Sequence, residues 1–501
     1  MLLILFALAV PVLLYIYVKW KYTYWERRGV AQAEVKFPFG SFTNAILRKM
    51  TVEQNIQQFY GKFKDRYRYF GMYLFFQPIW IVTDLNLIKR ILQSDFQHFT
   101  DHNFYHHNNE ILTNNIFNLE GERWRTLRTK LTPTFTSGKM KMMFGIVHDL
   151  SKQLKTLVES HVNNKPLLVT DAVARYSTDV IASCAFGIEA NCLENPDAAF
   201  RKYGRKIFEP RPYKFLFEQF VNWDVLAALG HQFHPSDTTK FFLEVVKETV
   251  EYREKNNIRK NDFVHLLLQL KNTGKLTEDG DLTNNSQGIL TYRDVAASMF
   301  IFYGAGFETT STTTSFLLYE LACHQDIQDR LRDEIREVLE KHGGKLTYEG
   351  LQEMHYGQKC IDETLRLYPP LAVHMRKCSK RYQVPDSDLV INKGDVAILP
   401  AFSIHRDPNV FPNPDEFNPE NFSDEARAGR ICSAWMPFGD GPRQCIGMRF
   451  GYMQMKTSVA TLLSNFRFTL HKSTPTKLTF ACNTITMTAV EDILLDVSKV
   501  D

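Results

Sequence analysis

The sequence has no pair of cysteines at the spacing Cys-x-x-Cys, although it contains eight cysteines in 501 residues. Zinc ribbons and ferredoxin-type clusters use such pairs, and a disulfide framework needs a denser set of cysteines. The composition therefore excludes these three classes and indicates a cytosolic domain with mostly unpaired thiols. The cysteines are Cys184, Cys192, Cys323, Cys360, Cys378, Cys432, Cys445 and Cys482.

Net charge is also small, because 60 lysines and arginines nearly balance 56 aspartates and glutamates, leaving +4. We therefore expect no nucleic acid as the main ligand, although a local basic face could bind an acidic partner. Tryptophan is scarce, with 6 residues against 38 phenylalanines. The large number of phenylalanines indicates a deep apolar interior or pocket. The length allows one large domain or two lobes around a shared core.

Charged residues are absent from Met1 to Val18, an apolar run just long enough to span a bilayer. The basic residues between Lys19 and Arg28 place the following chain in the cytoplasm. A cleaved signal peptide is the alternative. Ala7-Leu8-Ala9 has the form of a cleavage site, but it lies inside the apolar run, and no basic residue precedes that run. We predict a transmembrane signal anchor at residues 1–20, a linker at 21–36 and a globular domain at 37–501.

The periodicity of the second half predicts a mainly α fold with a minor β region. Ile327, Leu331 and Ile335 recur at helical spacing among charged residues, and the pattern stops at Gly343-Gly344. Between Arg381 and Pro400 the chain changes to short alternating segments with turn residues. This change indicates a small sheet.

One cysteine stands in a constrained loop, Phe438-Gly-Asp-Gly-Pro-Arg-Gln-Cys445-Ile-Gly447. A lone cysteine is more often a small buried hydrophobic residue. Here an apolar helical stripe follows directly, which places the thiol near the positive end of a helix dipole and favours the thiolate. The glycines allow the backbone to approach a flat ligand, and Arg443 can bind an anion beside it.

The loop resembles the haem-binding signature F-x-x-G-x-R-x-C-x-G of cytochrome P-450 monooxygenases, and every fixed position is met. The resemblance implies the cytochrome P-450 fold, with haem b (iron protoporphyrin IX) bound by the domain at 37–501. It makes Cys445 the axial metal ligand. It also places Phe438, Arg443 and Gly447 among the residues that bind the cofactor.

A second motif lies in the threonine-rich run from Tyr303 to Ser315. Threonine is a mediocre helix former, and the simplest explanation is a buried helix whose hydroxyls bond to carbonyls one turn earlier. In the functional interpretation Thr309 turns towards the carbonyl of Ala305, and Glu308 beside it helps to supply the protons that oxygen activation consumes.

This second motif, Ala305-Gly-Phe-Glu-Thr-Thr310, resembles the family's oxygen-activating motif A-G-x-[E/D]-T-[T/S]. The resemblance adds Ala305 and Thr309 to the cofactor-binding residues. It makes Glu308, Thr309 and Cys445 the catalytic residues.

The family also has a structural ion pair of the form E-x-x-R, which Glu363 and Arg366 match. On its own this spacing is weak, because many surface helices contain it. The family completes the pair with an arginine in a P-E-R-F-like segment, where this chain has Pro419-Glu-Asn-Phe422. Asn421 is therefore the third structural residue, and it carries no charge.

Trp124 and Arg128 match the family's W-x-x-x-R, which implies that they hold a haem propionate. An ordinary helix with a cationic face is the alternative. Arg376, placed only by its position after the E-x-x-R helix, joins Arg443 in the remaining propionate contacts. Arginine suits this role because its planar fork binds a carboxylate and stays charged.

The resemblance covers nearly the whole chain, and stretches such as Leu131-Thr-Pro-Thr-Phe-Thr-Ser-Gly-Lys139 are similar to insect microsomal members. It implies lipophilic substrates such as xenobiotics, plant toxins or insecticides. By resemblance the pocket is lined by Phe104, Ile116, Phe117, Phe302, Leu371, Val373 and Thr484. His374 is the odd polar neighbour. It could orient a substrate, but a bond to nearby backbone is the simpler role.

The resemblance further implies a single-pass protein of the endoplasmic reticulum membrane, in contact with membrane lipid, whose catalytic domain faces the cytoplasm. NADPH-cytochrome P-450 reductase would supply the electrons, with cytochrome b5 as an additional partner. Three alternatives stay open at this stage. They are an endogenous lipid or hormone hydroxylase of the same family, a haem-thiolate isomerase or dehydratase, and a haem carrier or sensor without catalysis.

Overall fold

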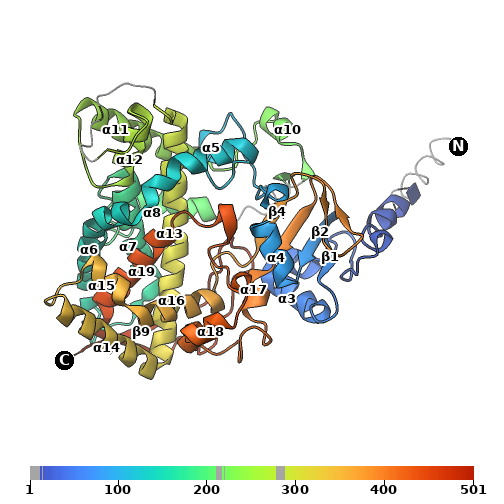
Figure 1. Ribbon diagram of the computed structural model, residues 1–501. Helices are drawn as coiled ribbons and strands as arrows, with labels where there is room; N and C mark the ends of the chain where they lie inside the picture. Colours follow the sequence, from blue (N-terminus) through green and yellow to red (C-terminus); the bar gives the residue numbers. More distant parts are fainter. Residues whose placement is uncertain are drawn as a thin grey trace. The chain divides into compact units, whose positions relative to one another are not determined.

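The structure is a computed structural model that describes residues 12–13, 15–209, 217–218, 220–277, 282 and 288–500. It divides into two compact units. Unit 1 comprises residues 1–103, 371–414 and 430–444, and unit 2 comprises residues 104–370, 415–429 and 445–501. Figure 1 shows the helices and strands along the chain.

Most of the predicted anchor at residues 1–20 lies outside the described residues; residues 12–13 and 15–20 are helical. Among the residues that the structure describes, no helix is both long enough and apolar enough to cross a bilayer.

Unit 1 is built on a four-stranded sheet in the order β1-β2-β7-β4. β1 pairs antiparallel with β2, β2 parallel with β7, and β7 antiparallel with β4. Its two-residue strands β5 (Tyr382–Gln383) and β6 (Val390–Ile391) form a separate hairpin. The sheet strands are β1 (Tyr69–Leu74), β2 (Gln77–Val82), β4 (His374–Lys377) and β7 (Val396–Leu399).

The longer helices of unit 1 begin at side chains that satisfy free backbone N–H groups. Thr51 and Gln54 form a reciprocal capping box at the start of α3, and Asp84 accepts from Leu87 N at the start of α4. The helices and 3₁₀ turns of this unit are η1 (Glu26–Arg28), α2 (Thr43–Ile46), α3 (Val52–Phe63), α4 (Leu85–Leu92), η2 (Phe96–His98), α17 (Ala401–His405), η7 (Cys432–Ala434) and η8 (Gly441–Arg443).

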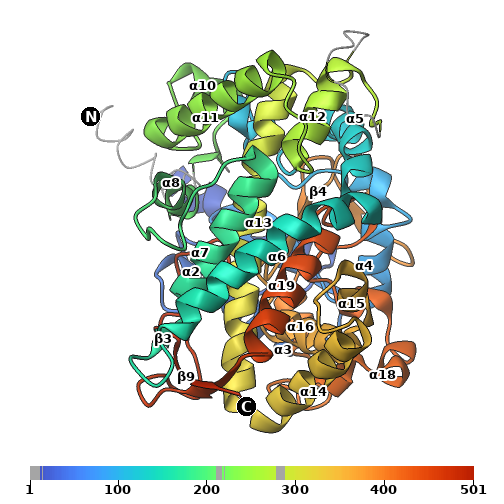
Figure 2. The same ribbon diagram turned by 90° about the vertical axis from the view of Figure 1, so that its left-hand side faces the viewer.

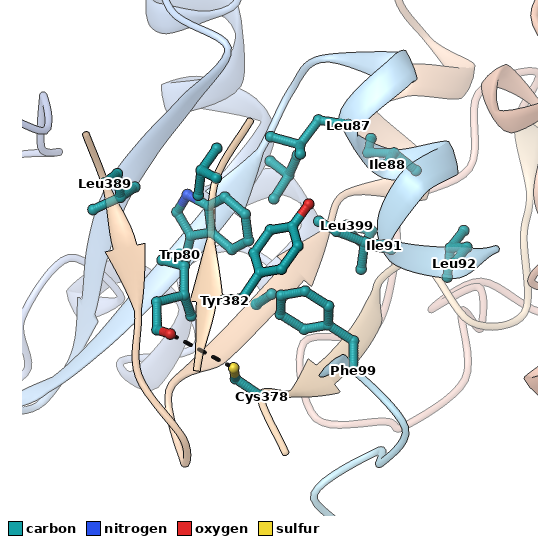
Figure 3. Packing of buried hydrophobic residues seen from close by; sticks show 14 of the residues in the cluster. Trp80, Leu87, Ile88, Ile91, Leu92, Phe99, Cys378, Tyr382, Leu389 and Leu399 are labelled. Atoms are coloured by element: carbon teal, nitrogen blue, oxygen red, sulfur yellow. Dashed lines mark hydrogen bonds between the residues drawn. The ribbon is translucent and has the colours of Figure 1, made fainter. Parts of the chain in front are cut away.

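A hydrophobic cluster fills the space between α4, the sheet and the β5–β6 hairpin in unit 1 (Figure 3). Trp80 and Phe99 lie at its centre, and the Phe99 ring meets the Tyr382 ring edge-on at a centroid distance of 4.9 Å. Cys378 belongs to this cluster, and its thiol is oriented towards the Ile391 carbonyl at 3.9 Å. β4, the strand that carries Arg376, pairs with β7, and β7 contributes side chains to this cluster. The packing of the cluster therefore holds β4 in place.

Unit 2 is mainly helical and centres on the 32-residue helix α13, which packs against α7 and α19 (Figures 1 and 2). α13 begins at a capping box formed by Thr291 and Asp294. The longer helices of unit 2 are α5 (Gly121–Leu131), α6 (Ser137–Glu159), α7 (Val169–Ile181), α8 (Ala199–Phe208), α11 (Ser236–Lys255), α12 (Phe263–Asn272), α13 (Tyr292–Cys323), α14 (Gln325–Lys341), α16 (His355–Leu367) and α19 (Met448–Leu463).

Shorter elements complete unit 2, including a three-stranded sheet in the order β3-β9-β8. They are η3 (Ile111–Thr113), η4 (Thr132–Phe135), β3 (Leu167–Leu168), the π-helical turn η5 (Ala182–Phe186), α10 (Trp223–Ala228), α15 (Tyr348–Glu353), η6 (Pro419–Phe422), α18 (Asp424–Ala428), β8 (Phe466–Leu470) and β9 (Leu494–Lys499).

The structure confirms the predicted mainly α fold with a minor β region. The predicted helix around Leu331 is α14, and both Gly343 and Gly344 after it adopt positive φ, at 66° and 76°. The alternating segments between Arg381 and Pro400 form β5, β6 and β7.

Candidate functional site

Within the cysteine loop the chain passes from unit 1, which includes Gln444, to unit 2, which begins again at Cys445. Gly439 and Gly441 both adopt a φ of +68°. A Cβ on Gly441 would lie 1.8 Å from the carbonyl oxygen of Leu92, at the end of α4. Gly441 therefore has a packing role besides the predicted approach of a flat ligand, which stays a prediction. Its lack of a side chain lets the loop pack on α4.

Arg443 is buried and held firmly within unit 1. Its Nε donates to the Thr100 carbonyl at 2.8 Å, and its Nη2 lies 3.6 Å from Asp101 Oδ1. The guanidinium thus already has a carboxylate neighbour in addition to any ligand. No sequence pattern indicated Thr100 and Asp101 as partners, because they lie more than three hundred residues earlier in the chain.

Cys445 lies three residues before α19, which begins at Met448 after an N-cap at Gly447. Its side chain is solvent-accessible, but the surrounding protein desolvates the thiol, which raises its pKa. The Gly447 N–H and the charge of Arg128 oppose this effect and lower the pKa. The predicted position near a helix start is confirmed. The helix start does favour the thiolate, as predicted, through the Gly447 N–H, but desolvation outweighs the two favourable contributions.

Trp124 and Arg128 lie one turn apart on α5, with Trp124 buried and Arg128 half-buried. Desolvation lowers the pKa of Arg128, and its attraction to Cys445 opposes that shift. The fold of unit 2 therefore brings Arg128 and Cys445 together from positions more than three hundred residues apart. A half-buried guanidinium of this kind favours an anionic ligand.

Arg376, on β4 of unit 1, is almost wholly buried. Its Nη1 donates to the Met375 carbonyl at 2.9 Å, and its Nε has no hydrogen-bond partner among the residues that the structure describes. Burial lowers the pKa of Arg376 to about 10, which still leaves it charged at neutral pH. A buried guanidinium N–H without an acceptor is costly unless a ligand supplies one.

His374, two residues before Arg376, has the backbone role that we preferred for it. Its Nε2 lies 2.7 Å from the Met436 carbonyl. Burial, followed by the charge of Arg376, lowers the pKa of His374 to about 4. The ring is therefore neutral at pH 7 and donates to Met436.

The threonine-rich segment lies in the middle of α13. Thr309 Oγ1 donates to the Ala305 carbonyl at 2.6 Å, and Ala305 itself is exposed although its neighbours Gly304 and Tyr303 are buried. The same backward bonding recurs at Thr313, whose hydroxyl donates to the Thr309 carbonyl at 2.8 Å. Both interpretations of this run are therefore compatible with the geometry, and the exposure of Ala305 distinguishes this turn from the next.

Glu308, the residue before Thr309 on α13, has a shifted pKa and a side-chain partner outside the helix. Burial raises the pKa of its carboxyl, and the Thr486 hydroxyl lies 3.4 Å from Oε1. The neighbouring Gly306 serves the packing of helices. A Cβ there would lie 2.8 Å from Cδ1 of Ile181, so Gly306 allows α7 to pack closely on α13.

Glu363 and Arg366 form a fully buried ion pair on α16, with Arg366 Nε donating to Glu363 Oε2 at 2.7 Å and Nη2 donating to Oε1 at 2.9 Å. Asn421 on η6 donates to Oε1 at 3.0 Å. The three predicted structural residues thus meet in unit 2.

The residues predicted to line a pocket fall in both units. In unit 2 the rings of Phe104 and Phe117 lie 4.9 Å apart, whereas Phe302 is buried against Phe135 at 5.1 Å. Thr484 is exposed, Ile116 is buried, and Leu371 and Val373 in unit 1 are half-buried. The assignment of these seven residues to a substrate pocket stays a prediction.

The side chains described above suit a metal that a cofactor already coordinates and that needs few ligands from the protein. Among the described parts of the chain, no group of three or more histidine, cysteine, aspartate or glutamate side chains could hold an ion. Within unit 2, one accessible thiol at Cys445 and a desolvated Arg128 instead match an iron porphyrin, which needs few protein ligands and a cation for its carboxylates.

Comparison with known proteins agrees with this match. A family profile described as Cytochrome P450 matches residues 36–494. Probable cytochrome P450 6a14 of Drosophila melanogaster is 40% identical over 493 residues, covering 96% of both chains. Cytochrome P450 6k1 of Blattella germanica is 38% identical over 497 residues, covering 97% of this chain and 94% of the relative. This chain belongs to the cytochrome P450 family, whose members are monooxygenases that bind haem b through a cysteine thiolate.

Proposed function

We propose that Cys445 is the thiolate ligand of haem b, and that the enzyme inserts one oxygen atom from O2 into lipophilic small molecules such as xenobiotics. The observation that carries the proposal is the accessible Cys445 thiol beside the charge of Arg128 in unit 2. Loss of the thiol proton is coupled to metal ligation, so the raised pKa of the free thiol is no obstacle.

Haem b, when bound, supplies the iron chemistry that activates dioxygen. The chain's own residues have three tasks in this proposal. Cys445 provides the sulfur ligand, and Trp124 and Arg128 hold a propionate. Glu308 and Thr309 deliver protons, because burial raises the pKa of Glu308 and so favours its protonated form. For Phe438, Arg443, Ala305 and Gly447, the cofactor-binding role is proposed from the family motifs, and for Arg376 from its position after the E-x-x-R helix.

The proposed electron source is NADPH through a flavoprotein reductase, with cytochrome b5 as a second donor. Family members work with a redox partner and, in general, with lipophilic substrates. The basic residues Arg123, Arg125, Lys139 and Arg449 offer positive charge for an acidic partner. We further propose an anchor at residues 1–20, a linker at 21–36 and a catalytic domain at 37–501 that faces the cytoplasm from the endoplasmic reticulum.

The absorption spectrum of the reduced protein with carbon monoxide tests the haem assignment. We expect the strongly red-shifted Soret band of a thiolate ligand, and its loss in Cys445→Ala. Cys432→Ala is the matched control, because Cys432 is also exposed. Retention of the band in Cys445→Ala, or a spectrum typical of histidine ligation in the wild type, would refute the assignment.

Turnover with purified reductase and lipid vesicles tests the reaction class. Consumption of NADPH and O2 together with a hydroxylated product from a lipophilic probe such as 7-ethoxycoumarin supports the monooxygenase. Rearrangement of a peroxide substrate without NADPH would instead indicate an isomerase or dehydratase.

A further inference from the structure

Glu308 has a side-chain partner far away in the sequence that no family motif includes. We infer that Thr486 is a positioning residue: its hydroxyl holds the Glu308 carboxyl in the orientation needed to deliver protons. This inference rests on the proposed function of Glu308.

The first support is the geometry of the contact. Thr486 is 4% exposed, whereas the preceding Thr484 and Ile485 are exposed. The Thr486 side chain therefore points inwards, and its Oγ1 lies 3.4 Å from Glu308 Oε1. This separation is at the long end for a hydroxyl hydrogen bond. Catalytic hydrogen bonds commonly shorten when substrate binds.

The second support is that the backbone around Thr486 is held in place within unit 2. Met487 N donates to the Pro370 carbonyl at 3.1 Å, where the chain leaves α16. Ala481 N donates to the Thr488 carbonyl at 2.9 Å and closes the turn. The turn thus presents the Thr486 hydroxyl to α13 from a fixed position, as a positioning residue requires.

The third support is the electrostatic balance at Glu308. Burial is the main influence and raises the pKa of the carboxyl. The hydrogen bond from Thr486 is the largest contribution that lowers the pKa, followed by the charges of Arg201 and Arg205 on α8. Both arginines are also engaged by Asp171 on α7. Among the groups that the structure describes around Glu308, Thr486 is thus a neutral one whose hydroxyl can be removed without altering a charge.

Three variants of the haem-loaded, full-length protein test the inference. Thr486→Val removes the hydroxyl and keeps the shape, and Thr486→Ser restores a hydroxyl. Thr488→Val is the matched control, because the Thr488 hydroxyl, as far as the described residues show, bonds to the Thr486 carbonyl at 3.1 Å and not to Glu308. Infrared titration measures the protonated carboxyl of Glu308, assigned by the band that disappears in Glu308→Gln.

We expect the titration midpoint of Glu308 to rise by about half to one pH unit in Thr486→Val, the range allowed by loss of one hydrogen bond. It should return towards the wild-type value in Thr486→Ser and stay unchanged in Thr488→Val. With reductase and lipid vesicles, the share of NADPH electrons released as hydrogen peroxide should rise roughly two- to tenfold in Thr486→Val alone.

An unchanged midpoint in Thr486→Val overturns the inference, and so does an equal shift in Thr488→Val. The carbon monoxide spectrum is recorded on the same samples. Absence of the red-shifted band in the wild type would refute the haem-thiolate assignment, whereas the infrared midpoint reports on Thr486 whatever that spectrum shows.

Discussion

Asn421 donates its side-chain amide to Glu363 Oε1 at 3.0 Å, in the place where the family motif has an arginine. The Glu363 carboxylate also accepts hydrogen bonds from Nε and Nη2 of Arg366, and one from the Asn418 N–H at 2.8 Å. Four donors therefore satisfy the carboxylate, and one buried negative charge faces one buried positive charge. A neutral third residue preserves this balance.

Replacing Asn421 by aspartate should be much more damaging than its small change in shape suggests. Asn421→Asp places a second carboxylate about 3 Å from Glu363 in a buried site, so we expect the free energy of unfolding to fall by about 3–5 kcal/mol. Asn421→Ala removes only the donor and should cost about 1.5–3 kcal/mol. Urea unfolding with haem retention measures both.

Asn418→Asp is the matched control for Asn421→Asp. Asn418 is exposed, and its side-chain oxygen accepts from Glu420 N at 3.1 Å, which a carboxylate also does. We expect little change in stability. Equal loss in Asn418→Asp and Asn421→Asp would show that the balance of charge around Glu363 is not the cause.

Thr309→Ala should allow NADPH to be consumed without oxygenation of the substrate. The hydroxyl that donates to the exposed Ala305 is lost, so proton delivery slows. We expect hydrogen peroxide release per NADPH to rise about tenfold or more, while the carbon monoxide band persists. Thr313→Ala removes the equivalent hydroxyl one turn later and should leave the ratio unchanged. Equal ratios in wild type and Thr309→Ala would exclude this role for Thr309.

The features that the sequence predicts well are those carried by neighbouring residues. The turn before α19, the backward hydroxyl bond of Thr309 and the pair of Glu363 with Arg366 all follow from local spacing. Helical periodicity likewise predicted α14 and its terminal glycines.

The features that the sequence could not predict depend on tertiary contacts. Thr486 lies 178 residues from Glu308, and a threonine in a loop has no pattern that indicates its partner. Gly441 was expected to serve a ligand, and its close packing against the Leu92 carbonyl, like that of Gly306 against Ile181, was not foreseen. A glycine shows only that space is short, and the structure identifies the neighbour.

Lys456, on α19, should give the protein an unusual dependence of stability on alkaline pH. The lysine is buried, its Nζ donates to the Leu351 carbonyl at 3.0 Å, and burial lowers its pKa to about 8 despite attraction to Asp362 and Glu334. Between about pH 8 and 10.5 the unfolded chain holds a proton that the folded protein has released. Unfolding therefore takes up a proton in this range, and raising the pH increases the contribution of Lys456 to stability.

Lys456→Met isolates this contribution, since the variant cannot titrate at the site. Loss of the bond to Leu351 changes stability by a constant amount, whereas the titration changes it with pH. We expect the free energy of unfolding of the wild type, relative to Lys456→Met, to rise by up to about 3 kcal/mol from pH 7 to pH 10.5. Urea unfolding across this range measures the difference, with Lys240→Met as the control for loss of an exposed lysine. A difference that stays flat or falls with pH would mean that Lys456 remains charged in the folded protein, held by Asp362 and Glu334.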